Sequence, residues 1–234
     1  MVRLVKNRRF GVSTRLFHTQ RLAREHLIEI AAHGFETVEL FATRSHLDFH
    51  NPAVVADFQQ WLAEAGLDLA SVTVAPADDA EQALFIARRI SVPVLTVGAT
   101  TPRETAKALE TLGEMAAPLG VKLAVDSTSM SPLGSLVHFV ESGVDADVGI
   151  CLDFAGAHRT GDLAYALELV AEHLVAARLP VDSTIDWAAA MTTAQKIGYE
   201  GSLMFDADVR GSAKETLARA KTARSKMERW LTSI

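Results

Sequence analysis

The stretch Val148-Gly-Ile-Cys-Leu-Asp-Phe-Ala-Gly-Ala-His158 decides the fold. It has the pattern of a buried strand that ends at Asp153, followed by a loop that carries His158. An apolar strand that closes on a carboxylate is typical of parallel barrels, which present polar groups at the C-terminal ends of their strands. Three other apolar runs end in the same way, at Glu39, Asp126 and Asp206. If these ends converge, they form a pocket lined by carboxylates.

Outward from this stretch, strand-like and helix-like runs alternate along the whole chain. The strand-like runs cover residues 9–14, 35–41, 67–74, 92–97, 121–126, 147–153, 173–179 and 202–206. Helical patterns follow at 19–32, 51–65, 79–90, 101–119, 132–142, 162–172, 184–197 and 213–231. Eight strand-then-helix units predict an α/β fold, a single (β/α)8 TIM barrel over residues 1–234. A doubly wound open sheet is the alternative, but no glycine-rich phosphate loop follows the first strand.

The composition of the chain argues against several classes of function. The chain has 234 residues, 49% of them hydrophobic and 22% charged, which supports one large core. Its net charge of −6 disfavours nucleic acid as a partner. The one cysteine, Cys151, lies in an apolar strand and is expected to be a buried, inert thiol. No run has the length of a signal peptide or membrane span, so we expect a cytoplasmic protein without membrane contact. A homo-oligomer is possible.

Four motifs in order along the chain resemble the xylose-isomerase-like TIM barrels. These motifs are Phe10–Thr14, Gly34–Leu40, Leu152–His158, and Thr184–Trp187 together with Ile197–Gly201. The family includes sugar and sugar-phosphate isomerases and epimerases and, more distantly, metal-dependent apurinic endonucleases. The resemblance implies a small carbohydrate bound at the C-terminal face of the barrel.

The resemblance also implies a metal centre, and here the sequence departs from the family. The family holds a divalent metal with a glutamate on strand five, an aspartate on strand six, a histidine on strand seven and a glutamate on strand eight. The two glutamates also carry the proton in the reaction. This chain keeps the strand-six ligand as Asp153, offers the shorter Asp126 and Asp206 on strands five and eight, and has Arg178 on strand seven. A register shift of two residues would move Arg178 out of the pocket.

Two hypotheses explain this substitution pattern. In the first, no metal is bound, and the Arg178 guanidinium supplies the positive charge by pairing with Asp153 and with Asp126 or Asp206. In the second, Asp126, Asp153 and Asp206 hold a weakly bound Mg²⁺ or Mn²⁺. Zinc is disfavoured, because the strand-seven position has no imidazole.

The site residues follow from the resemblance. Asp126 and Asp206 are the expected proton carriers, with His158 assisting, and Glu39, Asp153 and Arg178 are the expected substrate-binding residues. In the family's strand-six motif, His158 matches the second histidine, whereas the first is replaced by Gly156.

Structural interpretations stand beside these roles. Each aspartate could simply cap the helix that follows it, and His158 could be a hydrogen-bonding loop residue. His46, Asp48 and His50 resemble a metal cluster in spacing, but a solvated loop is the favoured interpretation.

Two functions remain open. The first is a divergent sugar or sugar-phosphate isomerase or epimerase, favoured by the acids at three strand ends. The second is a catalytically inactive barrel that binds a small polyol or serves as an assembly subunit, favoured by the loss of family ligands. Whether the protein is an enzyme is therefore open. A nuclease is disfavoured by the negative net charge and the missing histidines.

Overall fold

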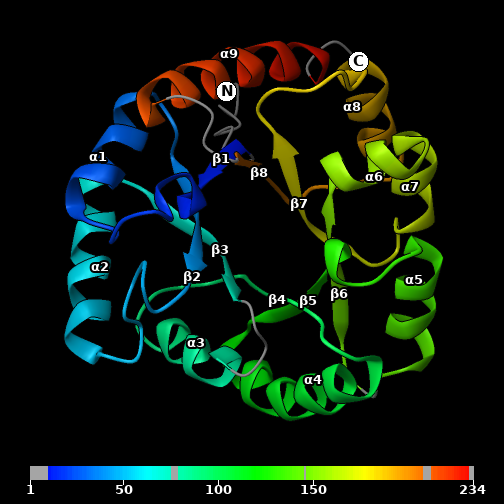
Figure 1. The fold of residues 1–234 in the computed structure, drawn as a ribbon, viewed down its shortest axis with the longest axis horizontal. Helices are drawn as coiled ribbons and strands as arrows, with labels where there is room; N and C mark the ends of the chain where they lie inside the picture. The colour runs from blue at the N-terminus through cyan, green and yellow to red at the C-terminus, as the bar shows by residue number, and fades with distance from the viewer. Residues whose placement is uncertain (1–9, 75–78, 145, 208–211, 232–234) are drawn as a thin grey trace, which may run out of the picture.

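The computed structural model describes residues 10–74, 79–144, 146–207 and 212–231. Its eight strands run parallel and pair in sequence order, and β8 closes on β1 to form a barrel. Helices surround the strands as an outer ring (Figure 1). The predicted TIM barrel is confirmed. The assignment of the whole range 1–234 to one domain stays a prediction, because the first nine and last three residues lie outside the described part.

The strands are short and evenly spaced along the chain. They are β1 (Phe10–Ser13), β2 (Thr37–Ala42), β3 (Asp68–Val74), β4 (Val94–Val97), β5 (Lys122–Asp126), β6 (Val148–Asp153), β7 (Leu174–Pro180) and β8 (Ser202–Asp206). The α-helices are α1 (Arg24–Ala32), α2 (Pro52–Ala65), α3 (Ala80–Ala87), α4 (Pro102–Ala116), α5 (Leu133–Ser142), α6 (Phe154–Thr160), α7 (Leu163–Leu169), α8 (Trp187–Lys196) and α9 (Ala213–Leu231). The described ranges also contain the short 3-10 helices η1 (Thr14–Phe17), η3 (Ala117–Leu119) and η4 (Ser127–Ser129).

Two local predictions differ from the structure. The segment after β6 was expected to be a loop, but it forms α6, because the Asp153 side chain accepts a hydrogen bond from the Ala155 N–H and caps the helix. The first long helix begins at Arg24 rather than at residue 19, because Ala23 is extended and its N–H is bonded to Nδ1 of His26. The predicted left-handed glycine after this helix is confirmed, since Gly34 has φ of 83°.

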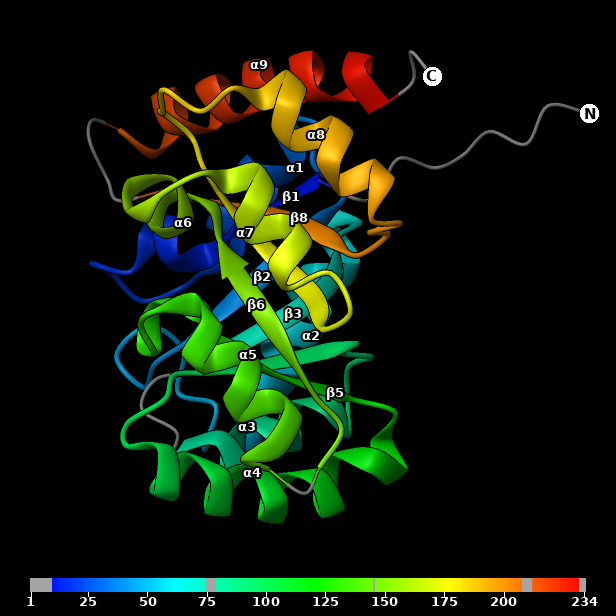
Figure 2. The same ribbon diagram turned by 90° about the vertical axis from the view of Figure 1, so that its right-hand side faces the viewer.

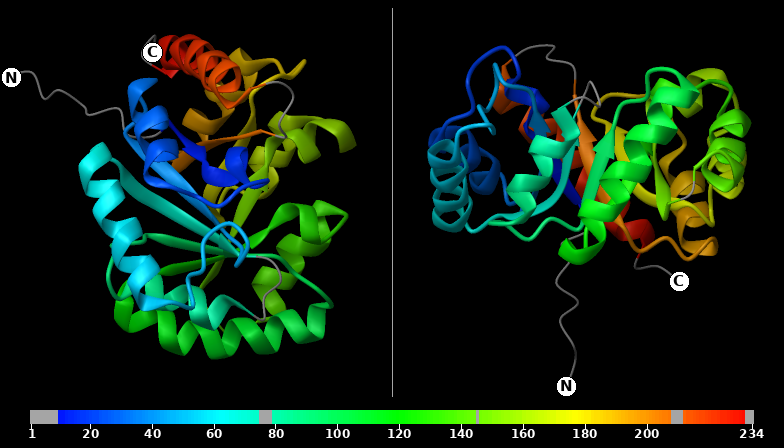
Figure 3. Two further views of the ribbon diagram at one scale, coloured as in Figure 1. Left: turned by 60° about the vertical axis from the view of Figure 1, so that its left-hand side comes forward. Right: turned by 90° about the horizontal axis from the view of Figure 1, so that it is seen from below.

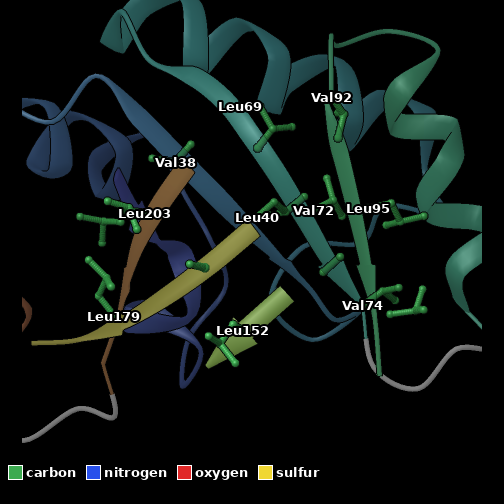
Figure 4. Close-up of a cluster of buried hydrophobic side chains, with 14 of the residues drawn as sticks. Val38, Leu40, Leu69, Val72, Val74, Val92, Leu95, Leu152, Leu179 and Leu203 are labelled. Atoms are coloured by element: carbon green, nitrogen blue, oxygen red, sulfur yellow. The ribbon is translucent and has the colours of Figure 1, made fainter. Parts of the chain in front are cut away.

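Most of the apolar core lies between the barrel and its helices. Every second strand residue faces outward, as Val38 and Leu40 on β2 and Val72 and Val74 on β3 show, and each is buried (Figure 4). Figure 2 shows α4 and α9 covering opposite sides of the barrel, and the views in Figure 3 show the ring from two further directions.

The interior of the barrel is different in character. One small apolar cluster there consists of Val94, Ala124, Cys151 and Ala176. Burial raises the pKa of the Cys151 thiol to about 12, so the prediction of a buried, unreactive thiol is confirmed. Side chains two residues further along β5 and β7 share this inward face, and they are Asp126 and Arg178. The interior therefore turns from apolar to charged toward the C-terminal ends of the strands.

Among the described residues, no helix combines the length and apolar character that crossing a membrane requires.

Candidate functional site

A buried ion cluster centred on Arg178 fills the inside of the barrel. Nη1 of Arg178 lies 2.5 Å from Oδ2 of Asp126, and Nε lies 3.3 Å from Oε1 of Glu39. Nη2 donates to Oγ1 of Thr73 at 2.8 Å. Because these partners come from β5, β2 and β3, the guanidinium ties together strands that are far apart around the barrel.

The strand register explains how Arg178 reaches this position. On β6 and β7, Asp153 pairs with Arg178, and the Arg178 side chain points into the barrel, where it meets Glu39 and Asp126. The expected ion pair with Asp153 is replaced by the pair with Glu39. The physical reason is that Oδ1 of Asp153 accepts the Ala155 N–H, so this carboxylate caps α6. The expected pair with Asp126 is present.

Both carboxylates of the cluster accept hydrogen bonds from neighbouring polar groups as well as pairing with Arg178. Glu39 accepts hydrogen bonds from Ser71 at 3.1 Å and from Thr73 at 2.9 Å. Asp126 accepts from the N–H and the hydroxyl of Thr128, at 2.8 and 2.7 Å. Burial alone would raise the pKa of Asp126, but the Arg178 charge and the bonds from Thr128 outweigh it and lower that pKa. A carboxylate of lowered pKa is a weak base.

Arg178 stays charged in this environment. Burial opposes the charge, but the carboxylates of Glu39 and Asp126 raise the pKa of Arg178 well above its ordinary value. The cluster is therefore a fixed, internally paired set of charges.

A cavity of 530 Å³ opens at the C-terminal mouth of the barrel, beside this cluster. Its polar lining consists of Arg15, Thr128, Asp153, Arg159, Asp182, Asp206 and Arg219. Of the six predicted site residues, the cavity brings together Asp153 and Asp206. The residues of the described chain that line it do not include Glu39, Asp126, His158 or Arg178.

Asp206 is a carboxylate of this cavity with only one of its oxygens paired. Its Oδ2 accepts from Nη1 of Arg15 at 2.9 Å, whereas its Oδ1 is buried and has no hydrogen-bond partner among the described residues. Burial raises the pKa of Asp206, and Arg15 offsets that rise in part, while the negative charge of Glu39 adds to it. Asp206 is thus a better proton acceptor than Asp126.

His158 lies outside the cavity. It is half-buried on α6, and its Nε2 is 3.1 Å from Oγ1 of Thr184. This contact fits the interpretation of His158 as a hydrogen-bonding residue that joins α6 to the segment before α8.

Sequence reasoning missed the arginines of the mouth and the hydroxyls of β3. Arg15, Arg159 and Arg219 come from η1, α6 and α9, and no motif links them. A signal was available for Ser71 and Thr73, because polar residues at alternate positions of an otherwise apolar strand share one face. They face inward and hold Glu39.

The loop with His46, Asp48 and His50 does not bring these residues to one point. Nδ1 of His46 contacts the Gln20 carbonyl at 2.9 Å, while Nε2 of His50 contacts Asp79 at 3.2 Å. Within the described ranges, no group of three or more histidine, cysteine, aspartate or glutamate side chains is arranged to hold a metal ion.

The donor set at the strand ends does not fit the divalent metal that the resemblance implies. Both oxygens of Asp126 are engaged, Oδ1 of Asp153 caps a helix, and Asp206 is paired with Arg15. The strand-seven position carries a guanidinium, which has no lone pair to give and repels cations.

Comparisons with known proteins show the fold. No protein-family model and no curated protein matches the sequence. Among solved structures, D-psicose 3-epimerase in the presence of D-fructose superposes with a TM-score of 0.77 at 13% identity, over 93% of this chain and 98% of that one. A xylose isomerase domain protein from Planctomyces limnophilus gives a TM-score of 0.77 at 15% identity, over 96% and 97%.

A xylose isomerase-like TIM barrel protein from Mycobacterium smegmatis, in complex with magnesium, gives a TM-score of 0.73 at 14% identity, over 96% of each chain. The chain therefore has the xylose-isomerase-like barrel fold over nearly its whole length.

Proposed function

We propose that this protein is a divergent sugar isomerase or epimerase that acts on a small carbohydrate at the C-terminal mouth of the barrel without a bound metal. One observation carries the proposal: Asp206 lines a cavity of 530 Å³ with one carboxylate oxygen that is buried and unpaired. The structural neighbours include D-psicose 3-epimerase in the presence of D-fructose, which supports a carbohydrate as the ligand.

The chemistry assigned to Asp206 is proton transfer next to a carbonyl group. The Asp206 carboxylate takes the proton from the carbon adjacent to the sugar carbonyl, and the electron pair moves onto the carbonyl oxygen to give an enediolate. Returning the proton to the former carbonyl carbon, while the hydroxyl proton of the enediolate moves to the other oxygen, isomerises the sugar. Epimerisation needs a proton delivered to the opposite face, for which a water molecule is the donor, and the proton held by Asp206 then neutralises the hydroxide that is left. The raised pKa of Asp206 strengthens it as a base. Arg15, 2.9 Å from Asp206 and also lining the cavity, stabilises the developing oxyanion.

The other predicted site residues take supporting roles in this proposal. Arg178, Asp126 and Glu39 form a buried ion cluster beside the cavity, in place of the metal that the resemblance implies. Asp153 lines the cavity and accepts substrate hydroxyl groups. His158 and Asp126 stay as weaker candidates for proton transfer. A homo-oligomer and a cytoplasmic location stay predictions of the sequence.

The test is exchange of substrate hydrogen in deuterium oxide. The protein is treated with a chelator and incubated with a panel of neutral and anionic aldoses and ketoses, and deuterium at the carbon next to the carbonyl is followed by NMR. We expect exchange with wild type and a loss of at least a hundredfold in Asp206→Asn, since general-base catalysis contributes about 10²–10⁴ in rate.

The matched control is Asp182→Asn. Asp182 lines the same cavity but pairs with Arg219 at 3.1 Å, so its substitution should leave exchange within a few-fold of wild type. Equal exchange in wild type and Asp206→Asn would contradict the assignment.

The alternative is an inactive barrel that binds a polyol. The pairing of Asp126 with Arg178 favours this alternative, because a paired carboxylate of lowered pKa is a poor proton carrier. The resemblance implies a proton carrier at this strand-five position. Saturable binding of a sugar together with no exchange across the panel would favour this alternative.

A further inference from the structure

We infer that the carbohydrate carries an anionic group, a carboxylate or a phosphate, and that Arg159 recognises it. The inference rests on the proposed carbohydrate site at the barrel mouth and adds the class of substrate to it.

The balance of charges at the cavity is the first argument. Arg15 is paired with Asp206 at 2.9 Å, and Arg219 is paired with Asp182 at 3.1 Å. Arg159 lines the same cavity but has no ion pair or hydrogen bond with its side chain among the described residues. It is therefore the cation of the lining that is available to a ligand.

The position of Arg159 between two cavities is the second argument. It also lines a neighbouring cavity of 200 Å³, whose wall carries a set of hydroxyl groups. These belong to Ser127, Thr128, Ser131 and Thr160. Thr128 and Arg159 border both cavities. Hydroxyl groups donate and accept hydrogen bonds and so suit a polyol, whereas an unpaired guanidinium suits an anion. The Thr128 and Thr160 hydroxyls donate inside the protein, to Asp126 and to backbone carbonyls of α6, and keep acceptor lone pairs for a ligand. The two cavities together therefore match a ligand that has hydroxyl groups and an anionic group.

Gly156 provides the third argument. A Cβ built at this position would lie 3.4 Å from Oδ2 of Asp153 and 3.8 Å from Nη2 of Arg159. Both polar groups lie at ordinary contact distance from this carbon, and Gly156 lines the smaller cavity; the space beside Gly156 is called the gap here. In the family motif this position carries a histidine, which would fill the gap. A ligand in the gap can give a hydroxyl hydrogen to Asp153 and accept hydrogen bonds from Arg159.

Long-range electrostatics make the local cation necessary. The chain has a net charge of −6, so its overall field opposes the approach of an anion. Recognition of an anionic sugar must then come from short-range, charge-assisted hydrogen bonds, which guanidinium groups supply in bidentate form.

The experiment measures binding by calorimetry, with glucose, glucuronate, glucose 6-phosphate and inorganic phosphate as probes, followed by a panel of ketose phosphates and sugar acids. We expect at least one anionic sugar to bind about tenfold or more tightly than its neutral counterpart, the usual contribution of a charge-assisted hydrogen bond. Arg159→Gln should remove this preference, and Arg159→Lys should restore part of it. Gly156→Leu should weaken the binding of anionic and neutral sugars alike, because the leucine side chain fills the gap.

Arg103→Gln is the matched control, because Arg103 is exposed at the start of α4 and lines neither cavity. The comparison of glucuronate with glucose 6-phosphate separates a carboxylate from a phosphate site. The inference is overturned if no anionic sugar binds more tightly than the neutral one, if Arg159→Gln leaves the preference intact, or if inorganic phosphate binds as tightly as every sugar.

Failure of the proposed function is distinguishable from failure of this inference. If anionic sugars bind more tightly than neutral ones in an Arg159-dependent way but no deuterium exchange occurs, the isomerase proposal is contradicted and the anionic site is supported. If deuterium exchange occurs with neutral sugars alone, the isomerase proposal is supported and the anionic site is contradicted.

Discussion

Arg178 is the residue on which the interior of the barrel depends. It donates one N–H to Asp126, one to Thr73 and one toward Glu39, so three of its five donors are used inside the protein. The side chains of Arg178 and Glu39 are 9% and 2% exposed, and water therefore screens their attraction little. Such a cluster is stable while complete and unfavourable once one partner is lost.

Replacing Arg178 by methionine should destabilise the protein by about 3–5 kcal/mol, because Glu39 and Asp126 would be left as unpaired buried carboxylates. Denaturant unfolding followed by circular dichroism measures this change. Combining Arg178→Met with Glu39→Gln and Asp126→Asn should recover part of the loss. Lys196→Met, which removes an exposed pair with Glu168, is the control and should have little effect. A small effect of Arg178→Met alone would contradict the account.

The sequence predicted the positions of these residues better than their partners. The run Leu123–Asp126 and the strand that contains Arg178 show where each side chain enters the barrel, because alternation fixes the face. The partner of Arg178 across the barrel is Glu39, 139 residues away. That choice depends on the reach of one long side chain across a closed sheet, which no local pattern encodes.

At the scale of elements, the segment between β2 and α2 is held by a buried histidine. His46 is 1% exposed, its Nδ1 contacts the Gln20 carbonyl, and its own carbonyl accepts the Leu22 N–H at 2.7 Å. Burial lowers the pKa of His46, and the nearby His26 and His18 lower it further. Backbone hydrogen bonds with Gln20 and Thr14 oppose this shift in part.

This segment should make stability sensitive to mild acid. A histidine whose folded-state pKa is lowered contributes stability that is present above its unfolded pKa of about 6.5 and is lost as the pH falls below it. The unfolding free energy should therefore decrease from pH 7 to pH 5, and His46→Asn should reduce the slope. Burial also lowers the pKa of His26, so His26 should account for the rest of the pH dependence. His138→Asn, at an exposed position, should keep the wild-type slope; an unchanged slope in His46→Asn would contradict this role.

The strands were easier to predict than the segments that follow them. Asp153 was recognised both as a strand end and as a possible helix cap, yet α6 was assigned to a loop, because its run Phe154–Thr160 is short and contains a glycine. The cap bond to Ala155 decides the outcome. Arg159 lies at the mouth of the barrel because it belongs to α6. Since the sequence did not predict α6, it also did not predict an unpaired guanidinium at the mouth.

At the scale of the whole molecule, the chain is a TIM barrel whose interior holds a buried ion cluster. Eight units of alternating pattern were enough to predict the closed sheet, since each strand-helix unit is local in sequence. The cavity at the mouth was not predictable in its details, because it is built from segments between residues 15 and 219. The central proposal is that the guanidinium of Arg178 takes the place of the metal that the resemblance implies.

The most direct test is the melting temperature of chelator-treated protein across a concentration series of Mn²⁺ and Mg²⁺, for wild type and Asp153→Ala. The account predicts no saturable rise in melting temperature for either protein, because the carboxylates are already engaged by Arg178, Arg15 and the N–H of Ala155. A ligand that binds the folded state raises stability with its concentration. A saturable rise in wild type that Asp153→Ala abolishes would contradict the account and restore a metal-dependent isomerase.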